Sequence, residues 1–576
     1  MKAEMHRGAD GQLFHKPFGK PRKDYTPYIV LGLPIIFLVV FLIWPLLQTV
    51  AHAFVLRGQA LSLENLTFAN FRRFFQAGLY QRSLYNSVVV SLAVVFFTML
   101  IGVPMGYCLA RVKMPFKNLF LAANVLPLIM PSFVGAFSWI ILLGYQGGLR
   151  QAINAVLGVF GLSLPPIYGY LGMILTLTLS YYPYVVLLSH GAFQSANYLL
   201  EEAAMLMGAR RGYILRTVTL PLVLPSLGAA AILVFIRAIG DFGIPAVLGG
   251  DKYVLPTLIH FRISGFWDLN GAAAISIVSV LITLFVLWIQ RRVVEAREYE
   301  TVSTSRSEMV LHEQPLIRRL AFAYCLLITV ISLLPQLTLV VMSFFERWVG
   351  VLPTGFTLQN YGAIPRLLRG PIANTFFLAT TASLIAAAFG ALMAYITVRR
   401  RPRGAIFLDL AVMLPFVLPG IVVAVALLTT FSSGPIVLAG TYTIIIISYV
   451  IRRTPYVFRS VSASLTQLDP ALEEASMISG ASWWYTFRRV SFPLVLPGIV
   501  SGAILSFVTL LTELATVILL YSARTRTLPV AIYDAVADAK YGEASALSVF
   551  LMGVVFIVVY LTNVVTGKSF ASSFKL

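Results

Sequence analysis

The chain has 576 residues, of which 59% are apolar and 11% are charged, and its mean hydropathy is +0.85. Soluble globular domains carry about 25% charged residues, so this composition excludes that class and indicates a polytopic membrane protein. The formal net charge of +20 would suit nucleic acid, but basic residues beside membrane spans account for it, and we expect membrane lipid and no nucleic acid as a partner.

Twelve apolar segments are long enough to cross a hydrocarbon core roughly 30 Å thick, since a helix rises about 1.5 Å per residue. They lie near 28–50, 86–110, 119–144, 168–190, 227–248 and 271–290, and near 320–343, 373–397, 405–431, 437–458, 499–521 and 543–565. The sequence therefore predicts an all-α membrane protein with about twelve transmembrane helices. Ala51-His52-Ala53 resembles a signal-peptide cleavage site, but the apolar run before it is too long for a signal-peptide core, so we interpret this segment as a span.

The distribution of Lys and Arg predicts how the spans are oriented. With a cytoplasmic N-terminus, the segments on that side carry 29 of the 43 basic residues and those on the other side carry 13. Because cytoplasmic loops are enriched in Lys and Arg, we expect both termini in the cytoplasm. Cys108 and Cys325 fall within predicted spans and indicate neither a disulfide framework nor a metal site.

Internal similarity indicates that the chain is a duplication. The offset is 290 for Asn70 and Asn360, 288 around the second span, and 272 from the fourth span onward, so an insertion around 145–165 belongs to the first half alone. The pairs at offset 288 are Asn86 and Asn374, Gly102 and Gly390, Tyr107 and Tyr395, and Arg111 and Arg399.

Each half has six spans, an even number, so we expect two parallel six-helix repeats related by an axis along the membrane normal. The domain division is then a cytoplasmic tail 1–27, a first domain 28–290, a cytoplasmic linker 291–319, a second domain 320–566 and a cytoplasmic tail 567–576.

The most similar stretches of the two halves are not spans. LEEAAMLMGARRGYILRTVTLPLVLP at 200–225 matches LEEASMISGASWWYTFRRVSFPLVLP at 472–497 in 15 of 26 positions, and each lies between the fourth and fifth spans on the cytoplasmic side. Glutamate near a helix start and glycine near its end are ordinary helix punctuation, but that interpretation does not explain why the segment is kept in both halves while the surrounding spans differ. We therefore expect a partner with two matching sites to bind these surfaces.

Capping residues predict a bent pair of short helices over 197–225 and 469–497. Asn197 and Asp469 stand as N-caps, and Pro470 follows at the first helical position, where its missing N–H is harmless. Gly208 and Gly480 are placed to end the first helix in the left-handed conformation. Four prolines are expected to break the second helix where the chain re-enters the membrane: Pro221, Pro225, Pro493 and Pro497.

The pattern Glu202-Ala203-Ala204, Gly208 and Leu220-Pro221 resembles the EAA loop of permease subunits of bacterial ABC importers. The second copy, Glu474-Ala475-Ser476, Gly480 and Phe492-Pro493, has Ser for Ala and Phe for Leu. The resemblance implies a type I importer fold with about six helices per domain, in which each loop forms a coupling helix that docks into a cytosolic ATPase. The coupling residues that it implies are Glu201, Glu202, Ala203, Gly208, Pro221, Glu473, Glu474, Ala475, Gly480 and Pro493.

A fused pair of permease domains of this length is similar to the branch that imports ferric iron, which has relatives for aminoethylphosphonate, sugar phosphates, thiamine and polyamines. GDFGIPAVLGG at 240–250 and TELATVILLYSARTRTLPVAIYD at 512–534 carry this weaker resemblance, which leaves the solute open. It implies a bacterial cytoplasmic membrane, an extracytoplasmic binding protein that recognises the solute, and two copies of an ATPase that hold ATP and Mg²⁺, with no cofactor in this chain.

The sequence offers little for enzyme chemistry or ion coupling. Gly567-Lys568-Ser569 ends like a phosphate-binding loop, but Thr562 stands where that loop requires its first glycine. The six His include no pair four residues apart, so we expect no metal site. A secondary transporter of the major facilitator type is the alternative class, but the loops CLARVKMPFKN and ITVRRRPRGAI lack the acid expected there.

Two acids occupy matching positions in the fifth span of each half, Asp241 and Glu513. A charge in the membrane costs roughly 2.5–3.5 kcal/mol, so an acid there needs a compensating environment. These acids could pack between the halves, line the translocation path or contact the solute, and the sequence does not decide among the three roles. Arg237 precedes Asp241 by four residues and could pair with it, whereas Thr509 precedes Glu513. Arg237, Asp241 and Glu513 are thus the candidate path residues, and the proline pairs of LPLIMP at 126–131 and LPFVLP at 414–419 are candidate kinks or gates.

Overall fold

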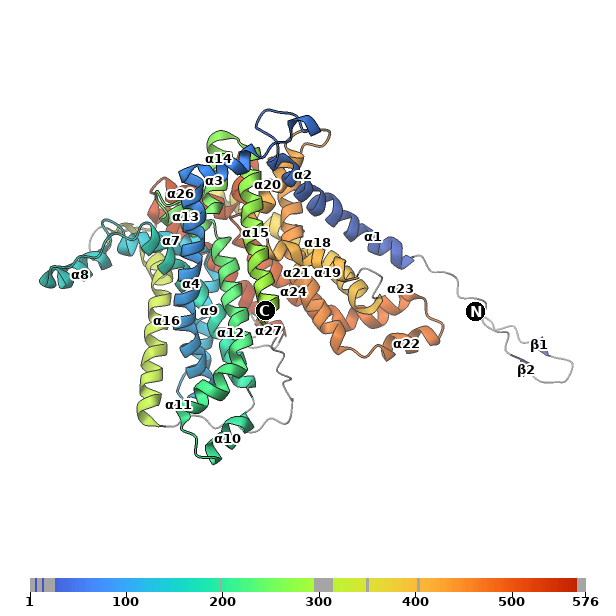
Figure 1. Ribbon diagram of the computed structural model, residues 1–576, viewed down its shortest axis with the longest axis horizontal. Helices are drawn as coiled ribbons and strands as arrows, with labels where there is room; N and C mark the ends of the chain where they lie inside the picture. The colour runs from blue at the N-terminus through green and yellow to red at the C-terminus, as the bar shows by residue number, and fades with distance from the viewer. Residues whose placement is uncertain are drawn as a thin grey trace.

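The computed structural model describes residues 26–196, 198–294, 314–348, 352–400 and 405–566, together with a short strand pair, β1 (His6–Arg7) and β2 (Leu13–Phe14). Most of the predicted tails 1–27 and 567–576 and of the predicted linker 291–319 lies outside the described residues. The rest of the chain is a helical bundle (Figure 1).

The first half contains a helix at each of its six predicted spans. The first span is α1 (Thr26–Leu38), η1 (Val39–Ile43) and α2 (Trp44–Ala53), the second is α4 (Gly78–Arg111), and the third is the bent series α5 (Lys117–Ala123), α6 (Leu126–Ile129) and α7 (Ser132–Leu143). The fourth is α9 (Tyr170–Ser195), the fifth is α11 (Arg211–Ile214), η4 (Leu215–Thr219) and α12 (Leu220–Ile239), and the sixth is α15 (Leu269–Val294). Shorter elements connect them: η2 (Leu63–Asn65), α3 (Ala69–Gln76), α8 (Gly148–Leu157), η3 (Gly158–Phe160), α10 (Tyr198–Leu206), α13 (Gly243–Leu248) and α14 (Leu255–Phe266).

The second half repeats this series. Its spans are α16 (Pro315–Ser343), α18 (Ala373–Tyr395) with η8 (Ile396–Arg400), the bent pair α19 (Ala405–Val417) and α20 (Gly420–Phe431), α21 (Tyr442–Gln467), α23 (Trp483–Thr486) with η9 (Phe487–Ser491) and α24 (Phe492–Leu511), and α27 (Tyr541–Thr566). Its connecting elements are the antiparallel pair β3 (Phe345–Arg347) and β4 (Thr354–Phe356), η6 (Gln359–Gly362), α17 (Ala363–Leu367), η7 (Leu368–Ile372), α22 (Ala471–Ile478), α25 (Val517–Leu520), η10 (Ala523–Thr525) and α26 (Leu528–Ala537).

Among the described residues, nine helices are long and apolar enough to cross a membrane, and the two bent pairs bring the number to eleven. The remaining predicted span, 437–458, is the 26-residue helix α21. It is less apolar than the others because it carries Arg452, Arg453 and Arg459. The predicted all-α membrane fold is therefore confirmed, with α21 as the span whose composition departs from the rest.

The predicted bounds of the fifth spans, 227–248 and 499–521, are wrong in both halves. The helices run over Gly212–Ile239 and Trp483–Leu511, so each begins earlier and ends earlier than expected. The four prolines that were expected to break the chain do not end these helices. Pro221 and Pro493 stand within the first two residues of α12 and α24, directly after the π-helical turns η4 and η9, and Pro225 and Pro497 lie inside the same two helices. A π turn widens the hydrogen-bond ladder, so a proline beside it interrupts the helix less than the sequence suggests.

The structure repeats individual hydrogen bonds as well as helices. Asn70 Nδ2 donates to the carbonyl oxygens of Ala53 and Val55 at 3.0 and 2.9 Å. Asn360 Nδ2 makes the same two bonds to the loop after α16, at 3.0 and 2.9 Å. In each half this asparagine therefore fixes the chain that leaves the first span, which supports the predicted duplication at the level of single contacts.

The glycines at offset 288 mark a repeated helix crossing. A Cβ at Gly102 would lie 2.6 Å from Cβ of Val185, and a Cβ at Gly390 would lie 2.8 Å from Cβ of Val457. Real Cβ contacts are not that short, so only glycine lets α4 approach α9 and α18 approach α21 this closely. These two crossings form the centre of each half.

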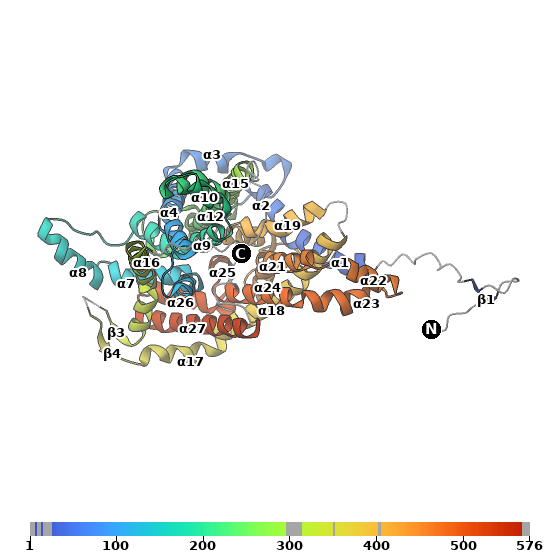
Figure 2. The same ribbon diagram turned by 90° about the horizontal axis from the view of Figure 1, so that it is seen from below.

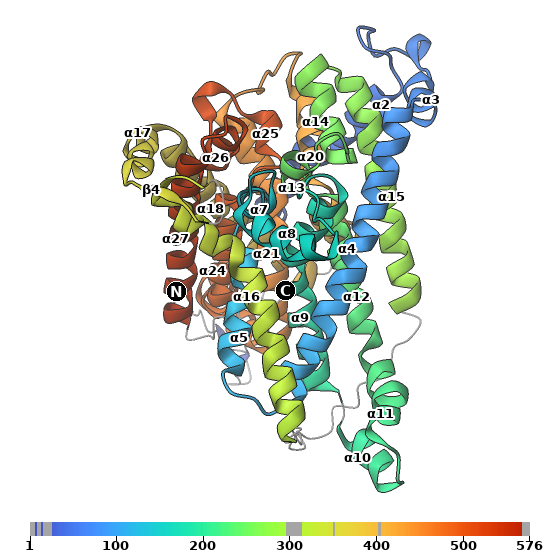
Figure 3. The ribbon, with the colours of Figure 1, turned by 90° about the vertical axis from the view of Figure 1, so that its left-hand side faces the viewer.

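The first span of each half contacts both halves, because α2 also packs on α15 and α16 also packs on α27 of its own half. Helix α2 contacts α20, and α16 contacts α7 and lies beside α4 (Figures 1 and 3). Seen from below, α16 lies beside α4 and α7, and its other neighbour α27 runs along the lower side of the view (Figure 2). The contacts of α2 and α16 with the opposite half join the two halves. Helices α14 and α26 lie at one end of the bundle, opposite α10 (Figure 3).

Candidate functional site: two repeated helical segments and a charged cavity between the halves

The repeated segments are bent helix pairs, as the glycine positions predict. Gly208 and Gly480 have φ angles of +83° and +88°, the left-handed region that favours glycine. The N–H of Ala209 donates to the carbonyl of Ala204 at 3.0 Å, and that of Gly208 to the carbonyl of Met205 at 2.9 Å. These two bonds form a Schellman motif, which ends α10 and turns the chain toward α11.

The predicted N-terminal caps are confirmed in part. Asp469 Oδ1 accepts a hydrogen bond from the N–H of Ala471 at 2.9 Å, but α22 begins at Ala471, one residue later than expected, with Pro470 as its N-cap residue. Asn197, the matching cap in the first half, lies outside the described residues.

The first glutamate of each repeated segment faces inward. Glu201 Oε1 accepts hydrogen bonds from Arg111 Nη2 at 3.0 Å and from Thr219 Oγ1 at 2.9 Å. Arg111 is the last residue of α4, and Thr219 ends η4. Glu201 therefore ties α10 to the end of the second span and to the start of the fifth.

Glu473 makes the equivalent contacts in the second half. Its carboxylate accepts from Tyr395 OH at 3.1 Å and from Ser491 Oγ at 2.8 Å, and it forms an ion pair with Arg399 Nε at 3.3 Å. Trp483 Nε1 donates to the same Tyr395 hydroxyl at 3.2 Å. The repeated Tyr and Arg are evident in the sequence, but their partner is not; a basic residue and an acid that recur together were the available signal.

The second glutamate and its neighbours face outward. Glu202 and Ala203 of the first segment are exposed, as are Glu474 and Ala475 of the second. The tips of both segments are apolar and protrude, with Leu206 85%, Met207 88% and Ile478 85% exposed. Each segment thus presents an apolar tip on a helix whose inner side is fixed to the bundle.

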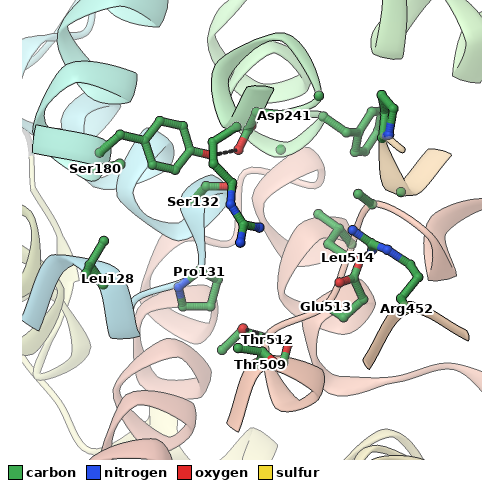
Figure 4. A pocket seen from close by; sticks show the side chains of 18 of the residues that line it. Leu128, Pro131, Ser132, Ser180, Asp241, Arg452, Thr509, Thr512, Glu513 and Leu514 are labelled. Atoms are coloured by element: carbon green, nitrogen blue, oxygen red, sulfur yellow. Dashed lines mark hydrogen bonds and ion pairs between the residues drawn. The ribbon is translucent and has the colours of Figure 1, made fainter. Parts of the chain in front are cut away.

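A cavity of about 220 Å³ lies between the two halves and is lined by matching stretches of both (Figure 4). The lining stretches are 127–133 and 416–420, 180–184 and 452–456, and 236–243 and 509–515. Pro127, Pro131 and Pro419 of the predicted proline pairs line it, and α7 and α20 begin at the cavity, directly after Pro131 and Pro419. The third span of each half bends there, by 96° and 108°, so the expected kinks are confirmed.

The two matched acids lie beside this cavity, but not inside a helix as the sequence analysis expected. The fifth spans end at Ile239 and Leu511, and each acid follows two residues later. Asp241 Oδ1 accepts the N–H of Ile244 at 2.9 Å, and Glu513 Oε1 accepts the N–H of Thr516 at 3.2 Å. Both carboxylates therefore cap the short helical segment after the break, which is a structural role that the span prediction concealed.

The expected ion pair between Arg237 and Asp241 is absent from the described residues. Asp241 Oδ2 accepts instead from Tyr181 OH at 2.7 Å. Arg237 Nη2 donates to Tyr456 OH at 3.2 Å, and its Cζ lies 5.1 Å from the ring centroid of Phe416. Because α12 ends between them, the two side chains are not stacked on one helix face and each finds another partner.

Glu513 is paired with two arginines that the sequence analysis did not connect to it. One carboxylate oxygen accepts from Arg452, which lies beside Glu513 in Figure 4, and the other accepts from Arg453; both arginines are on α21. Arg452 and Arg453 were among the 29 basic residues that the prediction of orientation assigned to the cytoplasmic side. Because they line the cavity, the number on that side falls by two. Adjacent arginines inside an otherwise apolar predicted span were the signal for a charged cavity.

The family model named Binding-protein-dependent transport system inner membrane component matches residues 99–298 and, a second time, residues 386–567. The chain belongs to this family. Each match spans most of one half, and the two matches agree with the duplication in the structure. The predicted permease fold, fused from two domains, is confirmed.

The comparison with individual relatives supports the same assignment for this inner membrane permease. The ferric transport system permease protein FbpB of Actinobacillus pleuropneumoniae is 29% identical over 513 residues, which cover 86% of this chain and 73% of that one. A protein of Salmonella typhi, provisionally named the 2-aminoethylphosphonate transport system permease protein PhnV, is 28% identical over 229 residues, 40% of this chain and 87% of that one. Among solved structures, a bacterial ABC transporter that imports alginate is 20% identical and has a TM-score of 0.40, over 47% of this chain and 97% of that one.

Proposed function

We propose that this permease moves a small solute across the cytoplasmic membrane with both of its termini in the cytoplasm, and that ATP hydrolysis on a separate pair of cytosolic ABC ATPase subunits drives the transport. ATP and Mg²⁺ would be bound by those subunits. The observation that carries the proposal is the pair of anchored helical segments with apolar tips, at 198–219 and 471–491.

The geometry of the segments suits the transmission of force. A protruding apolar tip such as Leu206 and Met207 buries surface when it enters a cleft of a partner, while the inner glutamate holds the same helix on the bundle. Movement of the partner would then shift the second and fifth spans of that half, because Glu201 connects both. Two such connections, one in each half, would switch the halves between inward-open and outward-open packings.

The solute would reach the outer face on an extracytoplasmic binding protein, and ferric iron is our first candidate for it. The length and fused organisation of the chain, together with its similarity to a ferric transport permease, support that choice. Aminoethylphosphonate, sugar phosphates, thiamine and polyamines are the alternatives. Calorimetric titration of the associated binding protein with each of these solutes would decide among them.

The central experiment tests coupling with a double variant, Gly208→Leu and Gly480→Leu. A side chain in the left-handed conformation costs about 1–2 kcal/mol at each position, so the Schellman turns should reorganise and displace both tips. We expect the variant to insert normally but to lose ATP-driven uptake in proteoliposomes that contain the ATPase and the binding protein.

The matched control is Gly191→Leu, which makes the same chemical change within α9, where a Cβ would meet no atom within 4 Å. The control should retain uptake. Normal uptake by the double variant would contradict the coupling role. Uptake driven by an ion gradient, with no ATPase present, would favour the alternative class of a secondary transporter.

A further inference from the structure

The cavity between the halves carries more positive than negative charge. Arg237, Arg452 and Arg453 line it, together with the carboxylates Asp241 and Glu513. Three guanidinium groups against two carboxylates leave a formal excess of one positive charge. In a membrane protein an excess charge is expensive unless it faces water, a partner or a ligand.

The neutralisation of Glu513 does not require this many arginines. One arginine would balance its charge, yet Arg452 and Arg453 both bind it. Arg237 forms no ion pair among the described residues; it donates to the hydroxyl of Tyr456 and lies over the ring of Phe416. The excess charge therefore lies in the cavity, and a structural ion pair does not account for it.

The arginines gather around one side chain. Arg237 donates to the hydroxyl of Tyr456, and Cζ of Arg453 lies 5.6 Å from the centroid of the same ring. Arg452 precedes Tyr456 by four residues, which is one helical turn of α21. The corresponding side chains of the first half, Ser180 and Tyr181 in place of Arg452 and Arg453, are uncharged.

Two longer helices add positive potential at the same place. Helices α7 and α20, each of 12 residues, begin at the cavity with Ser132 and Gly420, and the N-terminus of a helix carries a partial positive charge. A Cβ at Gly420 would lie 2.6 Å from Nη1 of Arg452. The glycine thus lets that guanidinium lie directly against the start of α20.

The cavity has no corresponding site for a bare cation, because both of its carboxylates already have partners. Asp241 is occupied by a tyrosine hydroxyl and a backbone N–H, and Glu513 by two arginines. Within the ranges that the structure describes, no three His, Cys, Asp or Glu side chains form a group that could hold a metal ion.

We propose that this cavity takes an anionic solute, one that presents carboxylate, phosphate or phosphonate oxygens to Arg237 and to the arginines of α21. The proposal rests on the transport function above and narrows its substrate class. It selects phosphonates, sugar phosphates and anionic chelates over the cations thiamine and polyamine. Ferric iron would then pass through the cavity as an anionic chelate, in which the oxygens of the chelator coordinate the iron.

The test measures solute binding to the purified full-length chain in lipid nanodiscs, without ATPase or nucleotide, by equilibrium dialysis. The probes are ferric citrate, free citrate, 2-aminoethylphosphonate and spermidine. We expect saturable binding of at least one anion and none of spermidine. Binding of ferric citrate but not of free citrate would identify a chelate as the source of the oxygens, whereas binding of citrate or of the phosphonate alone would identify a free oxyanion. Spermidine binding, or no anion binding up to about 10 mM, would overturn the proposal.

Variants test whether the charge is responsible. Arg237→Gln should weaken anion binding at least about tenfold, and Arg237→Lys should restore most of it. The matched control is Arg459→Gln, which removes an arginine from the same bundle outside the cavity, where Arg459 pairs with Asp409 at 3.5 Å. Unchanged binding in Arg237→Gln would refute the assignment.

A charge-adding variant keeps the test decisive if Arg237→Gln does not fold. Ser180→Arg adds a positive charge from the position that matches Arg452, and it should tighten anion binding about threefold or more; weaker or unchanged binding would count against the proposal. Because no ATPase is present, these results are separate from coupling. Intact anion binding with no ATP-driven uptake would refute the proposed function and leave the charge assignment standing.

Discussion

The replacement of Glu473 by alanine should release the second repeated helical segment, 471–491, from the bundle. The carboxylate of Glu473 is bound by Tyr395, Ser491 and Arg399, and its side chain is only 12% exposed. Hydrogen bonds to a charged group contribute about 1.5–3 kcal/mol each, and removal of one partner of a buried ion pair costs about 3–5 kcal/mol. Since the site lies near solvent and its arginine can rehydrate, we take about 3 kcal/mol for the lost attachment.

This loss should appear as local opening and not as global unfolding. At 1.4 kcal/mol for each factor of ten, amide hydrogens of α22 and the following turn should exchange about a hundredfold faster in Glu473→Ala. The assay is hydrogen–deuterium exchange with mass spectrometry on the full chain in nanodiscs. Glu201→Ala should show a smaller increase, about thirtyfold for about 2 kcal/mol, because two groups bind that carboxylate rather than three.

The neighbouring Glu474→Ala is the control. Glu474 is exposed and has no hydrogen-bond or ion-pair partner among the described residues, so its loss should leave exchange within about twofold of the wild type. If Glu473→Ala exchanged like the wild type, or if Glu474→Ala produced the same acceleration, the anchoring role of the inner glutamate would be wrong.

The remaining predictions concern packing. Gly102→Ala places a Cβ 2.6 Å from Cβ of Val185, so it should destabilise the chain by about 1–3 kcal/mol in thermal unfolding in detergent. Gly191→Ala, where a Cβ meets nothing within 4 Å, should be neutral or slightly stabilising. Equal effects of the two substitutions would contradict the close approach of α4 and α9 at Gly102. Asn360→Ala removes two bonds to backbone carbonyls at 3.0 and 2.9 Å and should cost about 1–3 kcal/mol in the same assay. Asn65→Ala, which removes one exposed bond, should cost less, and the reverse order would refute the interpretation.

The two repeated helical segments show what a repeated sequence can and cannot predict. The left-handed glycines could be predicted because a helix that ends and turns within two residues needs a positive φ, whatever surrounds it. The inward direction of Glu201 and Glu473 could not, because it depends on Arg111 and Arg399, which the fold brings from the far end of another helix. Two adjacent glutamates look alike in sequence, and only packing separates the buried one from the exposed one.

The sequence by itself determined the number and order of the apolar segments, the duplication, its parallel orientation and the place of the repeated motif between the fourth and fifth spans, since these follow from hydropathy, helix length and local backbone requirements. The tertiary structure alone decided where the fifth spans end, that each first span also contacts the other half, and how five charges are shared in the cavity. Arg452 and Arg453 meet Glu513 from 61 and 60 residues away, and Arg237 bonds to Tyr456 across 219 residues. Contacts of that kind depend on helix packing, which local sequence patterns do not encode.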